Sequence, residues 1–433
     1  MDLIDEVLER IKPTAEENKK IGYAVDDILK KIQERINGID VEPILAGSVA
    51  KGTHLKNPDI DIFLKFSPEY ERKFIEQFTL NLGMNVLESP VINYAEHPYI
   101  NGKHMGYDFD LVPCYRIDNS SKKITAVDRT PFHTKFVLEH LSEEGKDQVR
   151  LLKQFFKGIG VYGAEARIQG FSGYLTELLI IKFGTLENVL NNAAKWKKYT
   201  VISFNDVNED YLYNKFKAPL IFIDPVDENR NVASALSMDN YATFIYASKE
   251  FLRERTIKFF FPEINVVEKS IDRGTKFLHI MLPRPNVVDD VLYPQIRKFV
   301  NTIFKNLEEF GPIGYHYYVD DSIHVIIESY MLDLPRVMVH EGPPVWDRNS
   351  EKFIKKWKGR ALSGPYIING HFYADIDRKD RKMESKILSI IKRNSIGKDL
   401  DKISNSISFS RDQGTIERKE LFIFLEKKFP WEY

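Results

Sequence analysis

The sequence has one cysteine, no long apolar run and almost no net charge, and each of these features excludes a class of protein. With Cys114 as the only cysteine among 433 residues, an internal disulfide is excluded, and we expect the reducing environment of the cytoplasm. No apolar run approaches the roughly 18–20 residues that a membrane helix needs, and the acidic start of the chain has no signal-peptide pattern, so we expect no membrane contact. The formal net charge of −1 predicts no polyanionic partner for the chain as a whole.

The length is too great for one compact core and predicts about three domains. The composition, 43% hydrophobic and 29% charged, is ordinary for a globular protein. Charge is uneven along the chain, and residues 351–400 hold 13 Lys and Arg against 6 Asp and Glu. A basic segment is compatible with a nucleic-acid partner, although chance asymmetry on a solvated surface would give the same pattern.

The spacing of apolar residues predicts a multidomain α+β fold. A capping box formed by Thr14 and Glu17 predicts a helix over residues 14–36. We expect a small mixed sheet backed by helices, then a helical central domain, then an α+β module with a ferredoxin-like β-α-β-β element and a helical tail. The other expected elements are a helix at 68–83, strands at 91–94 and 107–112, a mostly helical segment at 142–252, the β-α-β-β element at 277–282, 288–310, 313–319 and 322–330, a loop from 342, and helices at 350–358, 380–393 and 415–428.

The stretch from Gly47 to Asp61 carries the clearest chemical signal. Asp59 and Asp61 are two apart in an expected strand, so their side chains point to one face. Asp110 lies on another expected strand; we favour it over Asp108, on the same face, because it is nearer the strand's carboxyl end. The role of Asp108 stays open. Neighbouring carboxylates repel unless a cation lies between them, and a set of oxygen ligands suits Mg²⁺. We therefore expect the first two aspartates and Asp110 to hold two Mg²⁺ ions about 3.5–4 Å apart.

A phosphate-binding loop is expected just ahead of these carboxylates. Gly47 and Ser48 follow an apolar strand and open a helical turn, whose N–H groups and hydroxyl can bind phosphate together with Lys51. Most Asp-x-Asp pairs are only polar strand faces or turns, but the upstream Gly-Ser pair and the third carboxylate favour a catalytic site here. Three residues further along the chain have ordinary structural explanations when only their spacing is considered. His133 would be a structural histidine, Lys153 a solvent-facing lysine of a helix and Tyr162 a tyrosine in a turn.

These residues belong to a longer series of motifs. The series consists of Gly47-Ser48 with Asp59-Ile-Asp61, Ala95-Glu-His-Pro-Tyr99, Asp110-Leu-Val-Pro-Cys-Tyr115, Ala126-Val-Asp-Arg-Thr-Pro-Phe-His133, Arg150-Leu-Leu-Lys153, Val161-Tyr-Gly-Ala-Glu165, Gly170-Phe-Ser-Gly-Tyr174, Asp224-Pro-Val-Asp and Arg230-Asn-Val-Ala233. With them the chain resembles the archaeal, class I CCA-adding enzymes, which are tRNA nucleotidyltransferases of the DNA polymerase β-like superfamily. The first motif is specific to the superfamily only, whereas the motifs with the His, Lys and Tyr are much narrower. Together they cover most of the first 240 residues.

The resemblance implies a catalytic palm at 1–141, a helical neck at 142–255 that completes the nucleotide pocket, and a tRNA-binding body and tail at 256–433. It implies addition of C, C and A to the tRNA 3′ end from CTP and ATP, without a nucleic-acid template. The implied ligands of the two Mg²⁺ ions are the three aspartates; the family sometimes has Glu at the first position, and Asp59 should still bind metal. The implied nucleotide contacts are Ser48 and Lys51 for the phosphates, His133, Lys153 and Tyr162 for the triphosphate and ribose, and Arg230 for the base edge.

The resemblance also suggests a grip on the acceptor stem and T-loop end of tRNA. The expected tRNA surface is Lys355, Lys356, Lys358 and Arg360, with Trp346, Trp357 and Tyr366 nearby; the alternative is a solvated helix packed by its aromatics. Other readings of the chain are a poly(A) polymerase, a small-molecule nucleotidyltransferase of the same superfamily, and a non-catalytic RNA-binding protein. The sequence does not decide the oligomeric state, and a homodimer stays open.

Overall fold

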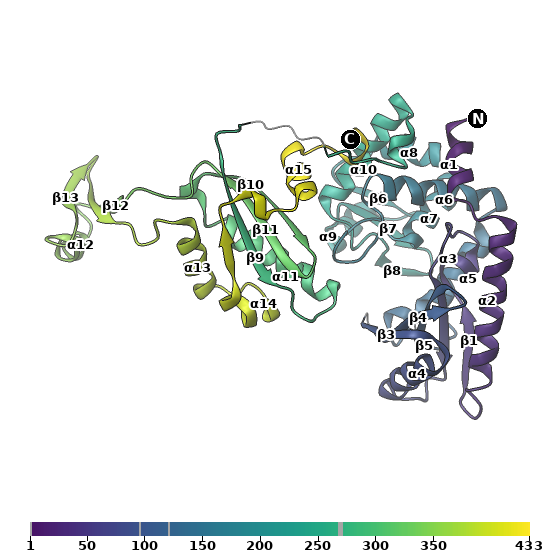
Figure 1. Ribbon diagram of the computed structural model, residues 1–433. Coiled ribbons are helices and arrows are strands. Elements are labelled where there is room, and N and C mark those ends of the chain that lie inside the picture. Colours follow the sequence, from purple (N-terminus) through teal and green to yellow (C-terminus); the bar gives the residue numbers. More distant parts are fainter. Residues whose placement is uncertain (1, 95–96, 120–121, 267–271) are drawn as a thin grey trace. The chain divides into compact units, whose positions relative to one another are not determined.

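The computed structural model describes residues 2–94, 97–119, 122–266 and 272–433 (Figure 1). The chain forms two compact units, Met1–Asn265 together with Lys428–Tyr433, and Val266–Lys427. In the part of the chain that is described, no helix has the length and apolar character needed to span a membrane.

The first part of the first unit is built on a mixed five-stranded sheet, as expected. Its order is β1-β2-β5-β4-β3. The strands are β1 (Val41–Leu45), β2 (Ile60–Phe66), β3 (Glu88–Tyr94), β4 (Pro98–His104) and β5 (Tyr107–Tyr115). Only β2 and β5 pair in parallel; the other neighbours are antiparallel. Helices α2 (Ala15–Gln33) and α4 (Arg72–Val86) bury Ile28 and Ile75 in the same core as Ile62 and Leu111 of the sheet.

The start of α2 confirms the predicted capping box. The hydroxyl of Thr14 accepts a hydrogen bond from the N–H of Glu17 (3.1 Å), and the Glu17 carboxylate accepts one from the N–H of Thr14 (2.7 Å). The helix predicted from residue 68 begins later, at Arg72, because the N–H of Tyr70 bonds to the carbonyl of Ser67 in a turn. Strand β4 is not predicted by the sequence pattern.

The rest of the first unit is mostly helical and has its own core. Its helices are α1 (Leu3–Ile11), α5 (Thr130–His140), α6 (Glu143–Gly158), α7 (Gly173–Phe183), α8 (Leu186–Ala193), α9 (Glu209–Phe216) and α10 (Met238–Glu254). The predicted apolar stripe of α6 is confirmed, since Val149, Leu152, Phe155 and Phe156 are all fully buried. The prediction of a helical segment is incomplete, because β6 (Thr200–Ile202), β7 (Leu220–Asp224) and β8 (Asp227–Asn231) form a small sheet.

The second unit confirms the predicted β-α-β-β element. Strand β9 (Lys276–Pro283), helix α11 (Asp289–Phe304) and strands β10 (Pro312–Val319) and β11 (Ser322–Ser329) follow in that order, and β15 (Ser408–Ser410) joins them in a sheet β10-β11-β9-β15. Helices α11, α13 (Met383–Arg393) and α14 (Lys398–Ile403) share one core with this sheet. Helix α15 (Arg418–Glu426) contributes Phe424 to a separate cluster with Phe277 and Ile326.

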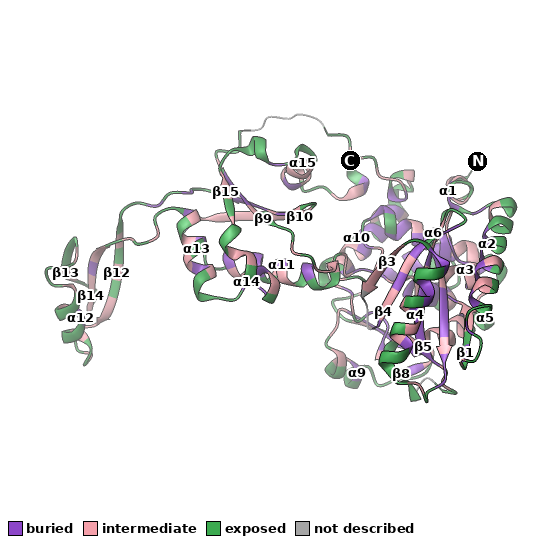
Figure 2. Ribbon diagram, turned by 60° about the horizontal axis from the view of Figure 1, so that its bottom comes forward, coloured by how far each residue is buried: buried purple, intermediate pink, exposed green. Residues whose placement is uncertain are grey.

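The second unit also carries a small sheet that the sequence pattern does not predict. Strands β12 (Val337–Pro344), β14 (His371–Asp377) and β13 (Ser363–Ile368) pair in that order, with α12 (Ser350–Trp357) packed on them. The prediction of a loop from Gly342 is therefore wrong. Strand β12 continues through a register shift between Glu341 and Pro344. Prolines, which have no N–H group, are tolerated at such an irregularity. Figure 2 shows that these strands are mostly exposed or half-buried.

Candidate active site

A short helical turn lies between β1 and β2, where the sequence predicts a phosphate-binding loop, and we call this segment the phosphate loop. Helix α3 (Gly47–Lys51) starts two residues after β1, with Gly47 at φ 64° and the helix-ending Gly52 at φ 68°. The N–H of Ala46 donates to the carbonyl of Asp61 (2.9 Å), which joins the loop to the start of β2. The loop and the carboxylate strand are thus held together by the backbone itself.

The parallel pairing of β2 and β5 places Asp61 directly opposite Asp110. Burial first, and then the charge of Asp110, raise the pKa of Asp61 to about 6. Burial also raises the pKa of Asp110, although a hydrogen bond from the Asn101 amide (2.9 Å) opposes this. Asp59, one residue ahead of β2, has its pKa raised by burial and by the charge of Asp108. The carboxylates of Asp59, Asp61, Asp108 and Asp110 therefore repel one another in a partly buried environment. A bound cation would reduce this repulsion.

These carboxylates fit a magnesium site that is completed by its substrate. Within the described ranges, no three His, Cys, Asp or Glu side chains already form a closed ligand set. Mg²⁺ commonly binds one or two carboxylates and fills its other positions with water and substrate phosphates. The pairs Asp61 with Asp110 and Asp59 with Asp108 match that pattern, and all the ligand atoms that they offer are oxygens.

Two lysines close to the carboxylates share one buried glutamate. The ammonium of Lys51 lies 2.6 Å from Oε2 of Glu177 in α7, and the ammonium of Lys153 in α6 lies 3.7 Å from Oε1. The hydroxyl of Thr53 donates to the same Oε1 (2.6 Å). The charges of both lysines lower the pKa of Asp61, so their field reaches the carboxylates.

Helix α6 fastens the segment that follows α3. Lys153 donates to the carbonyl (3.1 Å) and hydroxyl (3.2 Å) of Thr53. Arg150, one turn earlier, donates to the carbonyls of Gly52 and His54. Three consecutive carbonyls are therefore bound by two side chains of one helix, which fixes the phosphate loop against the helical part of the unit.

Aromatic side chains line the same region. A Cβ atom at Gly173 would lie 3.2 Å from the hydroxyl of Tyr162 and 3.9 Å from Cε of Lys153, so both side chains meet at the start of α7. Tyr174 stacks on the ring of His133 with 4.0 Å between ring centroids. Burial raises the pKa of Tyr162, and the charges of Glu177, Glu165 and Asp59 raise it further, so this tyrosine lies within the electrostatic reach of Asp59.

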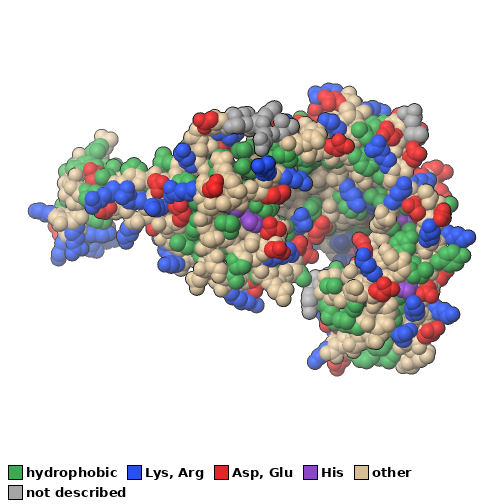
Figure 3. Space-filling model, in the orientation of Figure 1, with side chains coloured by type: hydrophobic (Ala, Val, Ile, Leu, Met, Phe, Trp, Pro, Cys, Tyr) green, Lys and Arg blue, Asp and Glu red, His purple; other side chains and the backbone are tan. Residues whose placement is uncertain are grey.

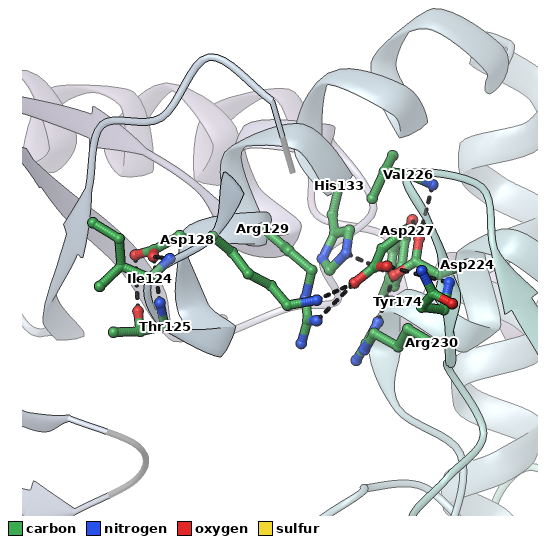
Figure 4. A network of polar contacts seen from close by, with 12 residues as sticks. Ile124, Thr125, Asp128, Arg129, His133, Tyr174, Asp224, Val226, Asp227 and Arg230 are labelled. Carbon is green, nitrogen blue, oxygen red and sulfur yellow. Dashed lines mark hydrogen bonds and ion pairs between the residues drawn. The ribbon is translucent and has the colours of Figure 1, made fainter. Parts of the chain in front are cut away.

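The buried carboxylate of Asp224, at the end of β7, organises the other side of the region (Figure 4). It lies 2.8 Å from Arg230 and 3.1 Å from Nε2 of His133, and it accepts from the hydroxyl of Tyr174 (3.1 Å). Burial alone would raise the pKa of Asp224, but hydrogen bonds from His133, Arg230 and the N–H of Val226 lower it to about 2. Burial lowers the pKa of His133, so Arg230 is the cationic partner of Asp224 at neutral pH.

The structure brings most of the predicted site residues together in the first unit. Those linked to this region by contacts or electrostatic interactions are Asp59, Asp61, Asp110, Lys51, His133, Lys153, Tyr162 and Arg230. Ser48 lies in the first turn of α3 and is half-buried. In the motif at residues 95–99, Ala95 and Glu96 lie outside the described residues, while His97 is buried and lies 2.8 Å from Glu76.

Sequence reasoning gave no role to four residues that the structure adds to the region: Glu177, Asp224, Tyr174 and Lys157. Lys157 lies over the Tyr162 ring (5.5 Å) and lowers the pKa of Asp59. Glu177 could have been noticed in the sequence, because it is a charged residue inside the apolar run of α7. Asp224 and Tyr174 lie in quoted motifs, but their partners are distant in sequence.

The predicted tRNA-binding residues lie in the second unit. Lys355 and Lys356 are in the last turn of α12, Lys358 and Arg360 follow it, and all four are exposed. Figure 3 shows Lys and Arg side chains gathered where α12 and the β12-β14-β13 sheet lie. Trp346 is 77% exposed beside this sheet, so an aromatic surface accompanies the basic one.

Three family models match successive parts of the chain. Residues 25–133 match a nucleotidyltransferase domain, residues 147–261 the second domain of tRNA nucleotidyltransferase, and residues 273–409 the C-terminal domain of CCA-adding enzyme. The first match covers the phosphate loop and the carboxylates, and the second covers Lys153, Glu177 and Asp224.

Curated relatives are similar over nearly the whole chain. A CCA-adding enzyme of Thermoplasma acidophilum is 42% identical over 94% of this chain and 94% of its own length. Those of Thermoplasma volcanium and Methanocaldococcus jannaschii are each 40% identical, over 98% and 82% of this chain and 97% and 84% of their own. At these identities and coverages, the chain belongs to the CCA-adding enzyme family of tRNA nucleotidyltransferases.

Proposed function

We propose that this enzyme adds C, C and A to the 3′ end of tRNA from CTP and ATP, without a nucleic-acid template. The observation that carries the proposal is the register of β2 and β5, which sets Asp61 opposite Asp110, near two buried lysines that share the carboxylate of Glu177. The printed names of the relatives, all CCA-adding enzymes, supply the substrate.

The proposed site binds divalent cations, with two Mg²⁺ ions on Asp59, Asp61 and Asp110. When bound, the ions would neutralise charge on the attacking and leaving oxygens of an in-line displacement. The raised pKa values of the three carboxyl groups and their oxygen-only chemistry support this assignment.

The protein groups then position and stabilise the reacting atoms. Asp110 is proposed to orient the tRNA 3′-hydroxyl and to accept its proton as the oxygen attacks the α-phosphate of the nucleotide. Ser48, Lys51 and Lys153 are proposed to hold the phosphates that leave as pyrophosphate. No covalent enzyme intermediate is needed, because positioning and charge stabilisation supply the catalysis.

The remaining contacts concern the sugar and the base. His133 and Tyr162 are proposed to contact the triphosphate and ribose. Arg230, whose guanidinium is oriented by Asp224, is proposed to read the edge of the incoming base together with the tRNA backbone. A guanidinium held by a buried carboxylate is a rigid donor, which suits the discrimination of C and A from other bases.

We further propose a division of labour along the chain. Residues 1–141 would be the catalytic palm, 142–255 the neck that completes the nucleotide pocket, and 256–433 the body and tail that bind the acceptor stem and T-loop end of tRNA. The three family-model matches support this order. The proposed surface for tRNA in the last part is Lys355, Lys356, Lys358 and Arg360, and the proposed location of this maturation step is the cytoplasm.

One experiment tests the proposal directly. The protein is incubated with Mg²⁺ and tRNA that lacks its 3′ CCA, with CTP, with ATP and with both. We expect two C residues from CTP alone, and three added nucleotides ending in A from both. An open-ended A tail from ATP alone would instead identify a poly(A) polymerase, and no incorporation at all would leave only RNA binding.

A further inference from the structure

Glu177 is a buried carboxylate in an otherwise apolar stretch of α7. Its side chain is fully enclosed, and its neighbours Leu175, Leu178 and Leu179 belong to the core. Burying a charged carboxylate is costly unless it is paired and hydrogen-bonded. An apolar residue here would extend the core, so the charge calls for another explanation.

The partners of Glu177 all flank the proposed phosphate site. They are Lys51 at the end of α3 (2.6 Å), Thr53 just after it (2.6 Å) and Lys153 in α6 (3.7 Å). The two lysine side chains are almost as deeply buried as the glutamate. One carboxylate therefore orients two ammonium groups that come from parts of the chain about a hundred residues apart.

The charges in this cluster do not balance. The pKa of Glu177 is lowered, because attraction to Lys51 and Lys153 outweighs the cost of burial, so the carboxylate is ionised. Burial lowers the pKa of Lys153 to about 8, and Glu177 opposes that shift, so this lysine stays mostly protonated near neutral pH. Two ammonium groups against one carboxylate leave one surplus positive charge close to Asp61.

We infer that Glu177 is a positioning residue for nucleotide addition, whose carboxylate fixes the ammonium groups of Lys51 and Lys153 so that their surplus positive charge meets the triphosphate. The inference rests on the proposed function. Glu177 itself touches no substrate; it acts through the two lysines. Removing its charge would free two mutually repelling ammonium groups and lose the preorganisation that phosphate binding needs.

A purely structural role is the competing explanation, and the surroundings of Glu177 argue against it. The phosphate loop is already fastened to α6 by Arg150, through the carbonyls of Gly52 and His54, and by Lys153, through the carbonyl of Thr53. These bonds do not involve Glu177. Glu177 adds side-chain bonds from α7 to Lys51 and Thr53, and of these groups it is the one that supplies a negative charge to both lysines.

The test compares Glu177→Gln and Glu177→Asp with the wild type. The measurements are kcat and KM for CTP at saturating tRNA that lacks CCA, the tRNA Kd, and the thermal midpoint. We expect Glu177→Gln to raise the KM for CTP about ten- to hundredfold, the range of a hydrogen bond to a charged group, with the tRNA Kd unchanged. Glu177→Asp keeps the negative charge on a shorter side chain, so its KM for CTP should lie between those of the wild type and Glu177→Gln.

The chain offers a matched control in Glu328 of the second unit. It is also fully buried and is bonded to Arg273 (2.6 and 3.1 Å) and Thr275 (2.8 Å). Glu328→Gln should lower the thermal midpoint and leave the KM for CTP unchanged.

The outcomes separate the two proposals. A wild type that adds no nucleotide defeats the proposed function; an active wild type with an unchanged KM in Glu177→Gln defeats only the role of Glu177. If Glu177→Gln does not fold, Glu177→Asp decides, since a KM equal to that of the wild type would again overturn the inference.

Discussion

The carboxylate of Asp61 lies so close to Gly47 that a Cβ atom at residue 47 would be 1.8 Å from its Oδ2 atom. Gly47 also has φ at 64°, in the left-handed region that favours glycine. Both facts require glycine at this position. A side chain would displace the Asp61 carboxylate from its place opposite Asp110, and it would also strain the left-handed backbone. The phosphate loop and the proposed metal ligands therefore depend on one another.

Gly47→Ala should abolish nucleotide addition while costing about 1–2 kcal/mol of unfolding free energy for the left-handed backbone. The matched control is Gly22→Ala in the middle of α2, where nothing lies within 4 Å of the added Cβ. That control should keep full activity and gain about 0.5–1 kcal/mol. Incorporation assays and urea unfolding measure both; an active Gly47→Ala enzyme would show that the carboxylate can move without harm.

Asp61→Asn and Asp110→Ala should each abolish nucleotide addition while tRNA binding persists. Because burial and the charge of Asp110 raise the pKa of Asp61 to about 6, its ionised form destabilises the metal-free protein at pH 7. Asp61→Asn should therefore melt at a higher temperature than the wild type in EDTA. Added Mg²⁺ should stabilise the wild type but not the variant. Equal loss of tRNA binding would instead mark these carboxylates as structural.

His279 should make stability depend on pH. Burial, aided by the charge of His324, lowers the pKa of His279 to about 4, below its ordinary value near 6.5. The unfolded chain then binds the additional proton between these values, so stability is lost as pH falls from about 6.5 to 4, by up to about 1.4 kcal/mol per pH unit. Urea unfolding of His279→Gln should show a shallower pH slope. His371→Gln, at a more exposed histidine, is the control; an unchanged slope in His279→Gln would refute the shift.

Local patterns were enough to predict the elements that rest on local rules. The capping box of α2, the turn at Gly47 and the alternation around Asp110 are all set by residues within a few positions of each other. The β-α-β-β element of the second unit was predictable for the same reason. The β12-β14-β13 sheet was not, because Gly342 and two prolines read as a loop while cross-strand pairing with residues some 30 positions away decides the structure.

The buried polar clusters could not be predicted, because their partners are remote in sequence. Glu177 pairs with Lys51 across 126 positions, and Asp224 meets His133 across 91. A glutamate in an apolar helix, read alone, fits a satisfied core residue as well as a functional one. Spacing predicted only a solvent-facing side chain for Lys153, which is in fact buried. Its prediction as a site residue came from the resemblance and not from the spacing.

Asp224→Asn should impair nucleotide binding more than folding. The substitution keeps the shape of the side chain but removes the charge that holds Arg230 (2.8 Å) and orients His133. We expect KM for both CTP and ATP to rise about tenfold or more, with tRNA Kd unchanged. Asp227→Asn, which loses contacts to Lys123 and Arg129 instead, is the neighbouring control and should lower the thermal midpoint alone. Equal KM values in the two variants would remove Arg230 from base recognition.

Changing Lys356 and Lys358 together to alanine should weaken tRNA binding and flatten its salt dependence. Both side chains are exposed at the end of α12, and each phosphate contact releases about 0.7–0.9 of a counterion, so losing two should reduce the slope of log Kd against log salt by about 1.5. The control is the double variant of Lys30 and Lys73, two exposed lysines of the first unit, which should leave the slope unchanged. A general loss of positive charge would affect both double variants alike. A slope that falls only in the variant of Lys356 and Lys358 therefore assigns phosphate contacts to this surface. A slope that falls in neither variant excludes this surface from the tRNA interface.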